Sequence, residues 1–143
     1  MQIHATSPAD EEASLLMHEL DLELAGRYPD HPATGIVAAE FEKQGGYFVV
    51  AKDEDTLLGC GAFRPVNNYC AEIKRMFVRP AARQRGIARS ILRHLEEEIR
   101  RRKFLSIVVE TGYRQPEAMA LYEAEGFFPI PPFLGYVGNP VSR

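Results

Sequence analysis

The 143-residue chain lacks the cysteine pairs and the long apolar runs that several classes of protein require. Its two cysteines, Cys60 and Cys70, lack the paired spacing of a zinc site, so free, partly buried thiols are expected rather than a disulfide. No apolar run approaches the roughly 20 residues that span a bilayer, and residues 1–10 lack the apolar core of a signal peptide. The sequence therefore predicts a single cytoplasmic domain without a membrane segment.

The net charge of −3 argues against a general nucleic-acid-binding protein, although the charges are unevenly distributed. Between Lys74 and Lys103 lie 11 of the 17 lysines and arginines, whereas residues 1–60 hold 12 of the 20 acids and three bases. Glutamates four residues before arginines partly neutralise this basic segment, and it lacks the interleaved aromatic residues on which bases stack. A basic segment in an acidic chain indicates a small polyanionic ligand.

Hydrophobic periodicity and turn residues predict an α/β domain with a mixed sheet. A first helix should follow an N-cap at Ser7 and run to about Arg27, and a shorter helix is expected over residues 34–43. The expected strands are 1–6, 47–51, 57–63, 70–78 and 105–109. A helix over about 86–102 joins the last two, and the apolar strand 105–109 should be buried and parallel to the strand before the helix. A final helix should start at Pro116 and end at Gly126, followed by irregular edge strands in 127–143.

The most informative segment is Arg83-Gln84-Arg85-Gly86-Ile87-Ala88, between an expected strand and an expected helix. The first N–H groups of a helix have no partner inside it, the helix dipole adds about half a positive charge there, and glycine permits close approach of a ligand. The segment therefore predicts a phosphate-binding site. It has neither the Gly-Lys-Ser/Thr of a Walker A loop nor the three glycines of a dinucleotide fingerprint, which argues against both of these sites.

The pattern Arg83-x-x-Gly86-x-Ala88 resembles the Gln/Arg-x-x-Gly-x-Gly/Ala signature of the GNAT family of N-acetyltransferases. A second segment, Gln115-x-x-Ala118-x-x-Leu121-Tyr122-x-x-x-Gly126-Phe127, is similar to a later motif of that family, which usually opens with Asn. The two motifs support the resemblance specifically over residues 71–127. It implies one domain over 1–143, with a mixed sheet of about six to seven strands, two splayed parallel strands and about four helices. The family's last strand would still be in progress at Ser142-Arg143, so this strand is short here or the chain is truncated.

The resemblance also implies that acetyl-CoA is the cosubstrate, that the acceptor is a primary amine of a small molecule or peptide, and that no metal takes part. Residues 76–78 would pair with the pantetheine arm like an additional strand, and the turn would hold the pyrophosphate. The side chains of Arg83 and Arg85 either add charge to this site or are solvated. The implied cofactor-binding residues are Met76, Phe77, Val78, Arg83, Gln84, Arg85, Gly86, Ile87, Ala88, Arg89 and Gln115.

Two side chains are candidate catalytic residues on the family's pattern. Glu72 matches the general base of histone-type members, and its alternative role is that of an exposed carboxylate paired with Lys74 or an arginine. Tyr122 matches the tyrosine that acts as general acid toward the CoA sulfur, and its alternative role is that of a core aromatic residue. A backbone N–H near Phe77 or Val78 would bind the thioester carbonyl. A catalytically weak acyl-CoA-binding sensor is the alternative function.

The acceptor pocket is expected between the first two helices, their connection and the tail. Asp30 would attract a cationic amine, whereas Arg64 or Arg75 would hold a carboxylate, as in an amino acid. His31 fits a loop histidine better than a base, because prolines flank it. The family resemblance allows a homodimer, and neither nucleic acid nor membrane is an expected partner. The candidate residues of the pocket are Tyr28, Asp30, His31, Arg64, Arg75, Tyr113 and Tyr136.

Overall fold

The computed structural model describes residues 1–27, 29, 36–109, 115–128 and 130, and in them five strands form one sheet in the order β1-β2-β3-β4-β5. The strands are β1 (Gln2–Thr6), β2 (Tyr47–Asp53), β3 (Thr56–Pro65), β4 (Cys70–Val78) and β5 (Ser106–Val109). Neighbours from β1 to β4 are antiparallel, and β5 is parallel to β4. The mixed α/β sheet is confirmed, but its five described strands are fewer than the six to seven predicted. Most of the tail in which further strands are expected lies outside the described residues.

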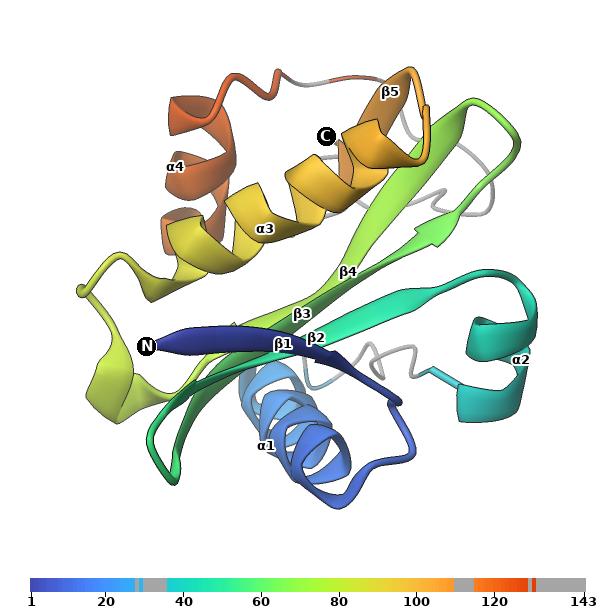
Figure 1. The fold of residues 1–143 in the computed structure, drawn as a ribbon. Coiled ribbons are helices and arrows are strands. Elements are labelled where there is room, and N and C mark those ends of the chain that lie inside the picture. The colour runs from blue at the N-terminus through green and yellow to red at the C-terminus, as the bar shows by residue number, and fades with distance from the viewer. Residues whose placement is uncertain (28, 30–35, 110–114, 129, 131–143) are drawn as a thin grey trace.

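Helices cover both faces of this sheet (Figure 1). One face carries α1 (Glu11–Arg27) and α2 (Ala38–Lys43), and the other carries α3 (Ile87–Arg101) and α4 (Pro116–Ala124). Leu16 of α1 belongs to an apolar core with Phe48 and Phe77, whereas Ile91 of α3 belongs to a second core with Phe63. Among the described residues, no helix is long and apolar enough to cross a membrane.

The start of α1 differs from the prediction. The N–H of Asp10 donates to the carbonyl of Ser7 at 2.9 Å, so residues 7–10 form a turn. Asp10 then caps the helix, because its Oδ2 accepts a hydrogen bond from the N–H of Glu12 at 3.2 Å and its carbonyl accepts one from Ser14. Asp10, rather than Ser7, is therefore the residue that starts α1.

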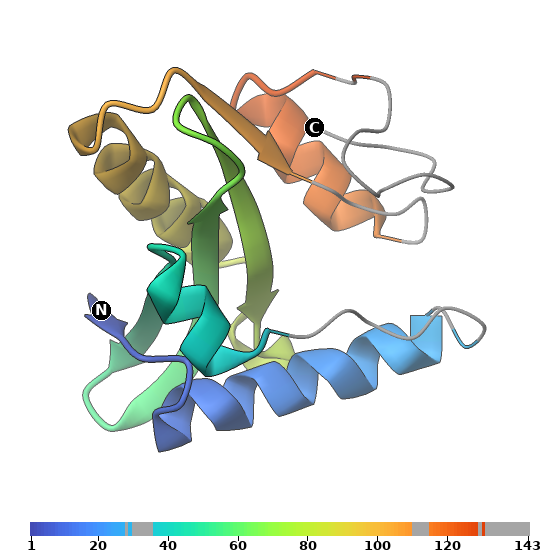
Figure 2. The same ribbon diagram turned by 90° about the vertical axis from the view of Figure 1, so that its right-hand side faces the viewer.

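The parallel strands β4 and β5 pair along only part of their length. Their register runs from Cys70 opposite Ser106 to Ile73 opposite Val109. Beyond Ile73, β4 has no strand on this side within the described chain, and Figure 2 shows the two strands diverging. Backbone N–H and C=O groups require partners, so this edge of β4 suits an extended ligand that pairs like a strand.

β5 is less buried than the sequence predicts. Val109 is buried at its end, but Ser106 is exposed and Leu105, just before the strand, is 81% exposed. β5 is the edge strand of the described sheet, which explains why it is not covered along its whole length. The prediction of a fully buried strand is therefore wrong, although its parallel pairing with β4 is confirmed.

Candidate active site

A β-bulge interrupts β4 near the point where β5 diverges. Two residues of β4, Arg75 and Met76, lie opposite the single residue Gly61 of β3. Arg75 has a φ of 58°, in the left-handed region that few residues other than glycine adopt. A Cβ on Gly61 would lie 2.7 Å from Sδ of Met76, so glycine makes room for Met76 on the α3 side. Burial raises the pKa of the Cys60 thiol to about 12, and its protonated Sγ donates to the carbonyl of Arg75 at 3.3 Å.

The backbone at the start of α3 is arranged to bind an anion. β4 leads into a short 3-10 helix, Pro80–Ala82, and Gly86 is the N-cap of α3. The φ angles of Gln84 and Gly86 are 64° and 75°, and left-handed residues in such turns direct N–H groups into a concave nest. Among the described residues, the backbone N–H groups from Gln84 to Arg89 have no acceptor, and the first helical bond is that of Ser90 to Gly86, at 3.1 Å. A Cβ on Gly86 would meet no atom within 4 Å, so the turn is open to a ligand.

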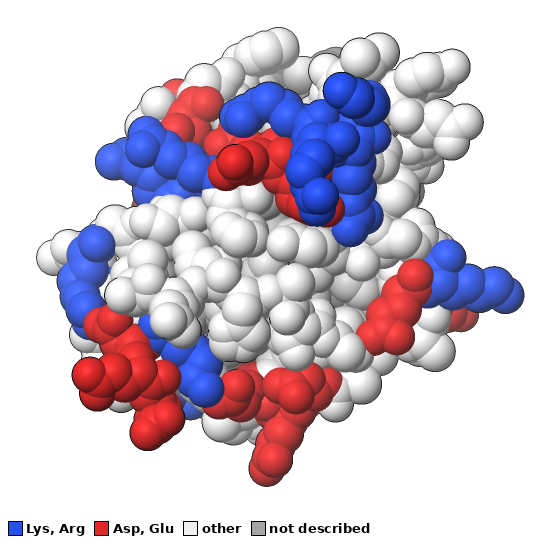
Figure 3. All heavy atoms as spheres, viewed as in Figure 1, with Lys and Arg blue, Asp and Glu red and all other residues white. Residues whose placement is uncertain are grey.

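The arginines around this turn are engaged by carboxylates. Nε of Arg83 also donates to the carbonyl of Val78 at 2.9 Å, which holds the turn against the end of β4. On the face shown in Figure 3, basic and acidic side chains lie in adjoining groups around a broad uncharged area rather than in one basic patch. The anion-binding capacity of the turn therefore lies in its backbone more than in its arginine side chains. The ion pairs are Arg83 with Glu23, Arg85 with Asp53, and Arg89 with Glu125.

Glu72 is a buried carboxylate on β4, with only 2% of the residue exposed. Its neighbours Ala71 and Ile73 belong to the core beneath α3, so strand alternation directs Glu72 toward the face that α1 covers. Its Oε1 accepts a hydrogen bond from Nε of Arg64 at 2.9 Å, and the two residues are opposite each other on β4 and β3. The alternative role predicted for Glu72 is that of an exposed carboxylate paired with Lys74 or an arginine. The ion pair with an arginine is confirmed, but the exposed position is wrong.

Tyr122 lies on α4 and is 3% exposed. Its ring contacts that of Phe127, with 5.6 Å between the ring centroids, so the side chain packs in the core. Burial raises the pKa of the Tyr122 hydroxyl above its ordinary value of 10.0, which keeps the group protonated at neutral pH. The structure shows no hydrogen bond from this hydroxyl to another described residue. A proton donor is thus available within the core.

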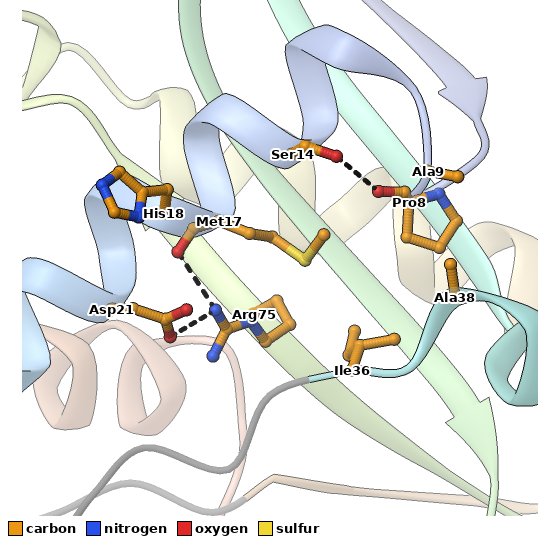
Figure 4. Close-up of a pocket in the computed structure, with 9 residues that line it drawn as sticks. All are labelled: Pro8, Ala9, Ser14, Met17, His18, Asp21, Ile36, Ala38 and Arg75. Atoms are coloured by element: carbon orange, nitrogen blue, oxygen red, sulfur yellow. Dashed lines mark hydrogen bonds and ion pairs between the residues drawn. The ribbon is translucent and has the colours of Figure 1, made fainter.

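A pocket of about 330 Å³ lies between α1, the approach to α2 and the bulge of β4 (Figure 4). Met17, His18 and Asp21 of α1 line it together with Ile36 and Arg75. Nη2 of Arg75 donates to the carbonyl of Met17 at 3.2 Å and to Oδ1 of Asp21 at 2.6 Å. These α1 residues were not predicted as pocket candidates from the sequence, because Met17 belongs to the apolar stripe of the helix and was expected to pack in the core. The available signal was the spacing of His18 and Asp21, which places them on one side of a helix.

The remaining candidate residues lie in different parts of the structure. Gln115 is the N-cap of α4, and its carbonyl accepts hydrogen bonds from Ala118 and Met119 at 3.1 Å. Of the two acceptor-pocket arginines, Arg75 lines the pocket and Arg64 pairs with Glu72. In the described part of the chain, no group of three metal-ligating side chains could hold an ion. The candidates outside the described residues are Tyr28, Asp30, His31, Tyr113 and Tyr136.

The fold agrees with comparisons to known proteins. Residues 13–127 match the Acetyltransferase (GNAT) family. The chain belongs to the GNAT family. An IAA acetyltransferase from Azospirillum brasilense is 34% identical over 137 residues, which cover 95% of this GNAT chain and 90% of the relative. The uncharacterised N-acetyltransferase YsnE of Bacillus subtilis is 34% identical over 116 residues, covering 78% of the chain and 77% of the relative.

Solved structures show the same GNAT fold. A putative acyl-CoA N-acyltransferase from Klebsiella pneumoniae superposes with a TM-score of 0.82 at 25% identity, over 99% of this chain and 93% of that one. A GNAT family acetyltransferase from Elizabethkingia anophelis with acetyl-CoA bound has a TM-score of 0.68 at 18% identity, over 91% and 77% of the two chains. The predicted family and enzyme class are confirmed: this GNAT protein is an acyltransferase that uses acetyl-CoA.

Proposed function

We propose that this enzyme transfers an acetyl group from acetyl-CoA to a primary amine of a small molecule or peptide by direct attack, with Glu72 as a water-linked base and Tyr122 as the acid. One observation carries the proposal. A buried carboxylate, Glu72, lies on β4 two residues before the edge that β5 leaves open, and it faces the side of the sheet that holds the α1 pocket. A base in this position is within reach of an acceptor that enters from α1.

The binding of the donor is supported by backbone groups. We assign its pyrophosphate to the N–H groups from Gln84 to Arg89, which have no acceptor among the described residues, and its pantetheine amides to the edge of β4 at residues 76–78. Gln115 at the start of α4 is a further candidate contact. When bound, acetyl-CoA supplies a thioester that an amine can attack.

The protein's part in the reaction concerns two protons. An alkylamine has a pKa near 10, so at neutral pH it is mostly an ammonium ion that lacks a lone pair for attack. Glu72 would take this proton through a water, and Arg64 would hold the carboxylate in place. As the new C–N bond forms and the C–S bond breaks, the Tyr122 hydroxyl would give its proton to the leaving sulfur, and the proton that the new amide nitrogen loses would restore the hydroxyl. Its raised pKa means that it reaches the sulfur in its protonated form.

A thiol-release assay tests the proposal. The full chain is supplied with acetyl-CoA and a panel of amino acids, polyamines, aminoglycosides and peptides, and the products are checked by mass spectrometry for an acetylated amine. We expect release with one acceptor class and its loss in Glu72→Gln and Tyr122→Phe. Saturable CoA binding without release on any acceptor would instead favour the sensor function. A homodimer stays a prediction that sedimentation would check.

A further inference from the structure

Arg75 has hydrogen-bonding capacity that the described protein does not use. Only 5% of its side chain is exposed. Both of its hydrogen bonds, to Met17 and Asp21, come from Nη2. Among the described residues, Nε of Arg75 is the fully buried side-chain nitrogen that lacks a partner. Buried N–H groups are nearly always satisfied in native proteins, so a donor without a partner on a residue that lines a pocket points to a ligand.

The bulge is what brings this guanidinium to the pocket. In a regular strand, residue 75 would point to the same face as Ile73, which packs beneath α3. The extra residue and the φ of 58° turn Arg75 to the opposite face, where Figure 4 shows it among the pocket residues of α1. A left-handed conformation is costly for a residue other than glycine and tends to be kept at functional sites.

A neighbouring arginine shows what a purely structural contact to α1 looks like. Arg79 donates to both carboxylate oxygens of Glu19, from Nε at 3.0 Å and from Nη2 at 2.7 Å. Its Nη1 also lies 3.4 Å from the carbonyl of Leu57. Arg79 thus links the end of β4 to α1, and its Nε has a hydrogen-bond partner. Arg75 links β4 to α1 in a similar way, but its Nε has no partner among the described residues.

We propose that Arg75 binds a carboxylate of the acceptor, so that the enzyme acetylates small amines that carry a free carboxylate, amino acids above all; this rests on the function proposed above. Nε would donate to one carboxylate oxygen, a charge-assisted hydrogen bond, without displacing Asp21 from Nη2. Asp21, with 45% of its side chain exposed, adds a negative charge beside the guanidinium. The pocket therefore offers one charge of each sign, as a zwitterion requires.

The dimensions of the site agree with this acceptor. A volume of about 330 Å³ lies at the small end of ligand pockets, which are typically about 300–1,000 Å³. Arg75 follows Glu72 by three residues on the same strand, which corresponds to roughly 10 Å at about 3.3 Å per residue. An amine next to a carboxylate held by Arg75 would lie between the two residues, with room for a water in front of Glu72.

Matched acceptors test the inference directly. Each standard amino acid is compared with its α-amide in the thiol-release assay, for the wild type, Arg75→Gln and the control Arg79→Gln. The amide lacks the negative charge but keeps the amine and the side chain. We expect the wild type to favour the acid, and Arg75→Gln to lower kcat/KM for the acid by about 10- to 100-fold, mainly through KM, while the amide is unaffected. Arg79→Gln should leave the ratio of acid to amide unchanged.

Folding is monitored by circular dichroism and by acetyl-CoA affinity. If Arg75→Gln does not fold, Arg75→Lys replaces it, because lysine keeps the charge but has no Nε and should show the same loss of preference. Equal rates for acids and amides in the wild type would overturn the inference and leave the proposed function standing. A preference for acids that survives in the folded Arg75 variant would also overturn it. If no acid or amide releases thiol, the proposed function is wrong for these acceptors, and the inference falls with it.

Discussion

Nε of Arg64 lies 2.9 Å from Oε1 of Glu72 across the β3–β4 ladder, and the carboxylate end of this pair is buried. The contact gives Glu72 a defined position on the α1 side of the sheet, where β4 still pairs with β5. Removing one partner of a buried ion pair leaves the other charge without compensation, which is more harmful than removing both.

We therefore expect Arg64→Gln to reduce kcat by about 10-fold or more and to lower the free energy of unfolding by about 1–3 kcal/mol, since the buried carboxylate loses its partner. Urea unfolding and steady-state rates measure the two effects. The double variant Arg64→Gln with Glu72→Gln is the control, because it removes both charges: it should regain stability but not activity. If Arg64→Gln keeps the rate and stability of the wild type, the Arg64–Glu72 pair has no role in catalysis or folding.

Tyr122→Phe should reduce kcat by about 10- to 1,000-fold and leave acetyl-CoA affinity unchanged, because the variant loses only the hydroxyl that we propose as the acid toward the leaving sulfur. The hydroxyl has no hydrogen bond to another described residue, so the melting temperature should change little. Since burial raises the pKa above 10.0, ionisation of Tyr122 should not reduce wild-type activity as the pH rises to 10. Full turnover of the variant at every pH would eliminate Tyr122 as the acid.

Gly86→Ala should weaken CoA binding by about 10-fold or more, measured by calorimetry, because the Cβ would intrude where a ligand approaches the backbone and would strain the left-handed turn. Gly126→Ala is a matched control: Gly126 also has a positive φ, of 94°, and a Cβ there also meets no atom within 4 Å. Both changes should cost about 1–2 kcal/mol of stability. Equal effects of the two variants on CoA affinity would refute the assignment of the pyrophosphate to this turn.

The sequence was sufficient to predict the β4–α3–β5 unit and the glycine-containing turn at the start of α3. β4 has the bounds predicted for it, because an apolar run closed by Pro80 has few other interpretations. The bulge of β4 was not predicted. Its one signal in the sequence is that two consecutive polar residues, Lys74 and Arg75, interrupt the apolar pattern of the strand. Only the register with β3 shows that Arg75, like Lys74, turns toward α1.

The charges of the site were harder to predict than its backbone. Arg83 and Arg85 lie in a basic segment, but each pairs with an acid far away in the sequence, Glu23 and Asp53 respectively. Such pairs depend on how α1 and the β2–β3 hairpin pack, and composition contains no information on that packing. For the same reason only the folded chain shows that Asp21 of α1 lines a pocket together with Arg75.

The most direct test of the account is the pH dependence of kcat/KM for the wild type and Glu72→Gln, at saturating acetyl-CoA and with an acceptor found in the thiol-release assay. We predict that the wild type is active at neutral pH. The variant should be slower by about 10²–10⁴-fold there and should approach the wild type only as the pH nears the pKa of the amine, about 10, where no base is needed. Profiles of the same shape and height for the two proteins would contradict the proposed role of Glu72.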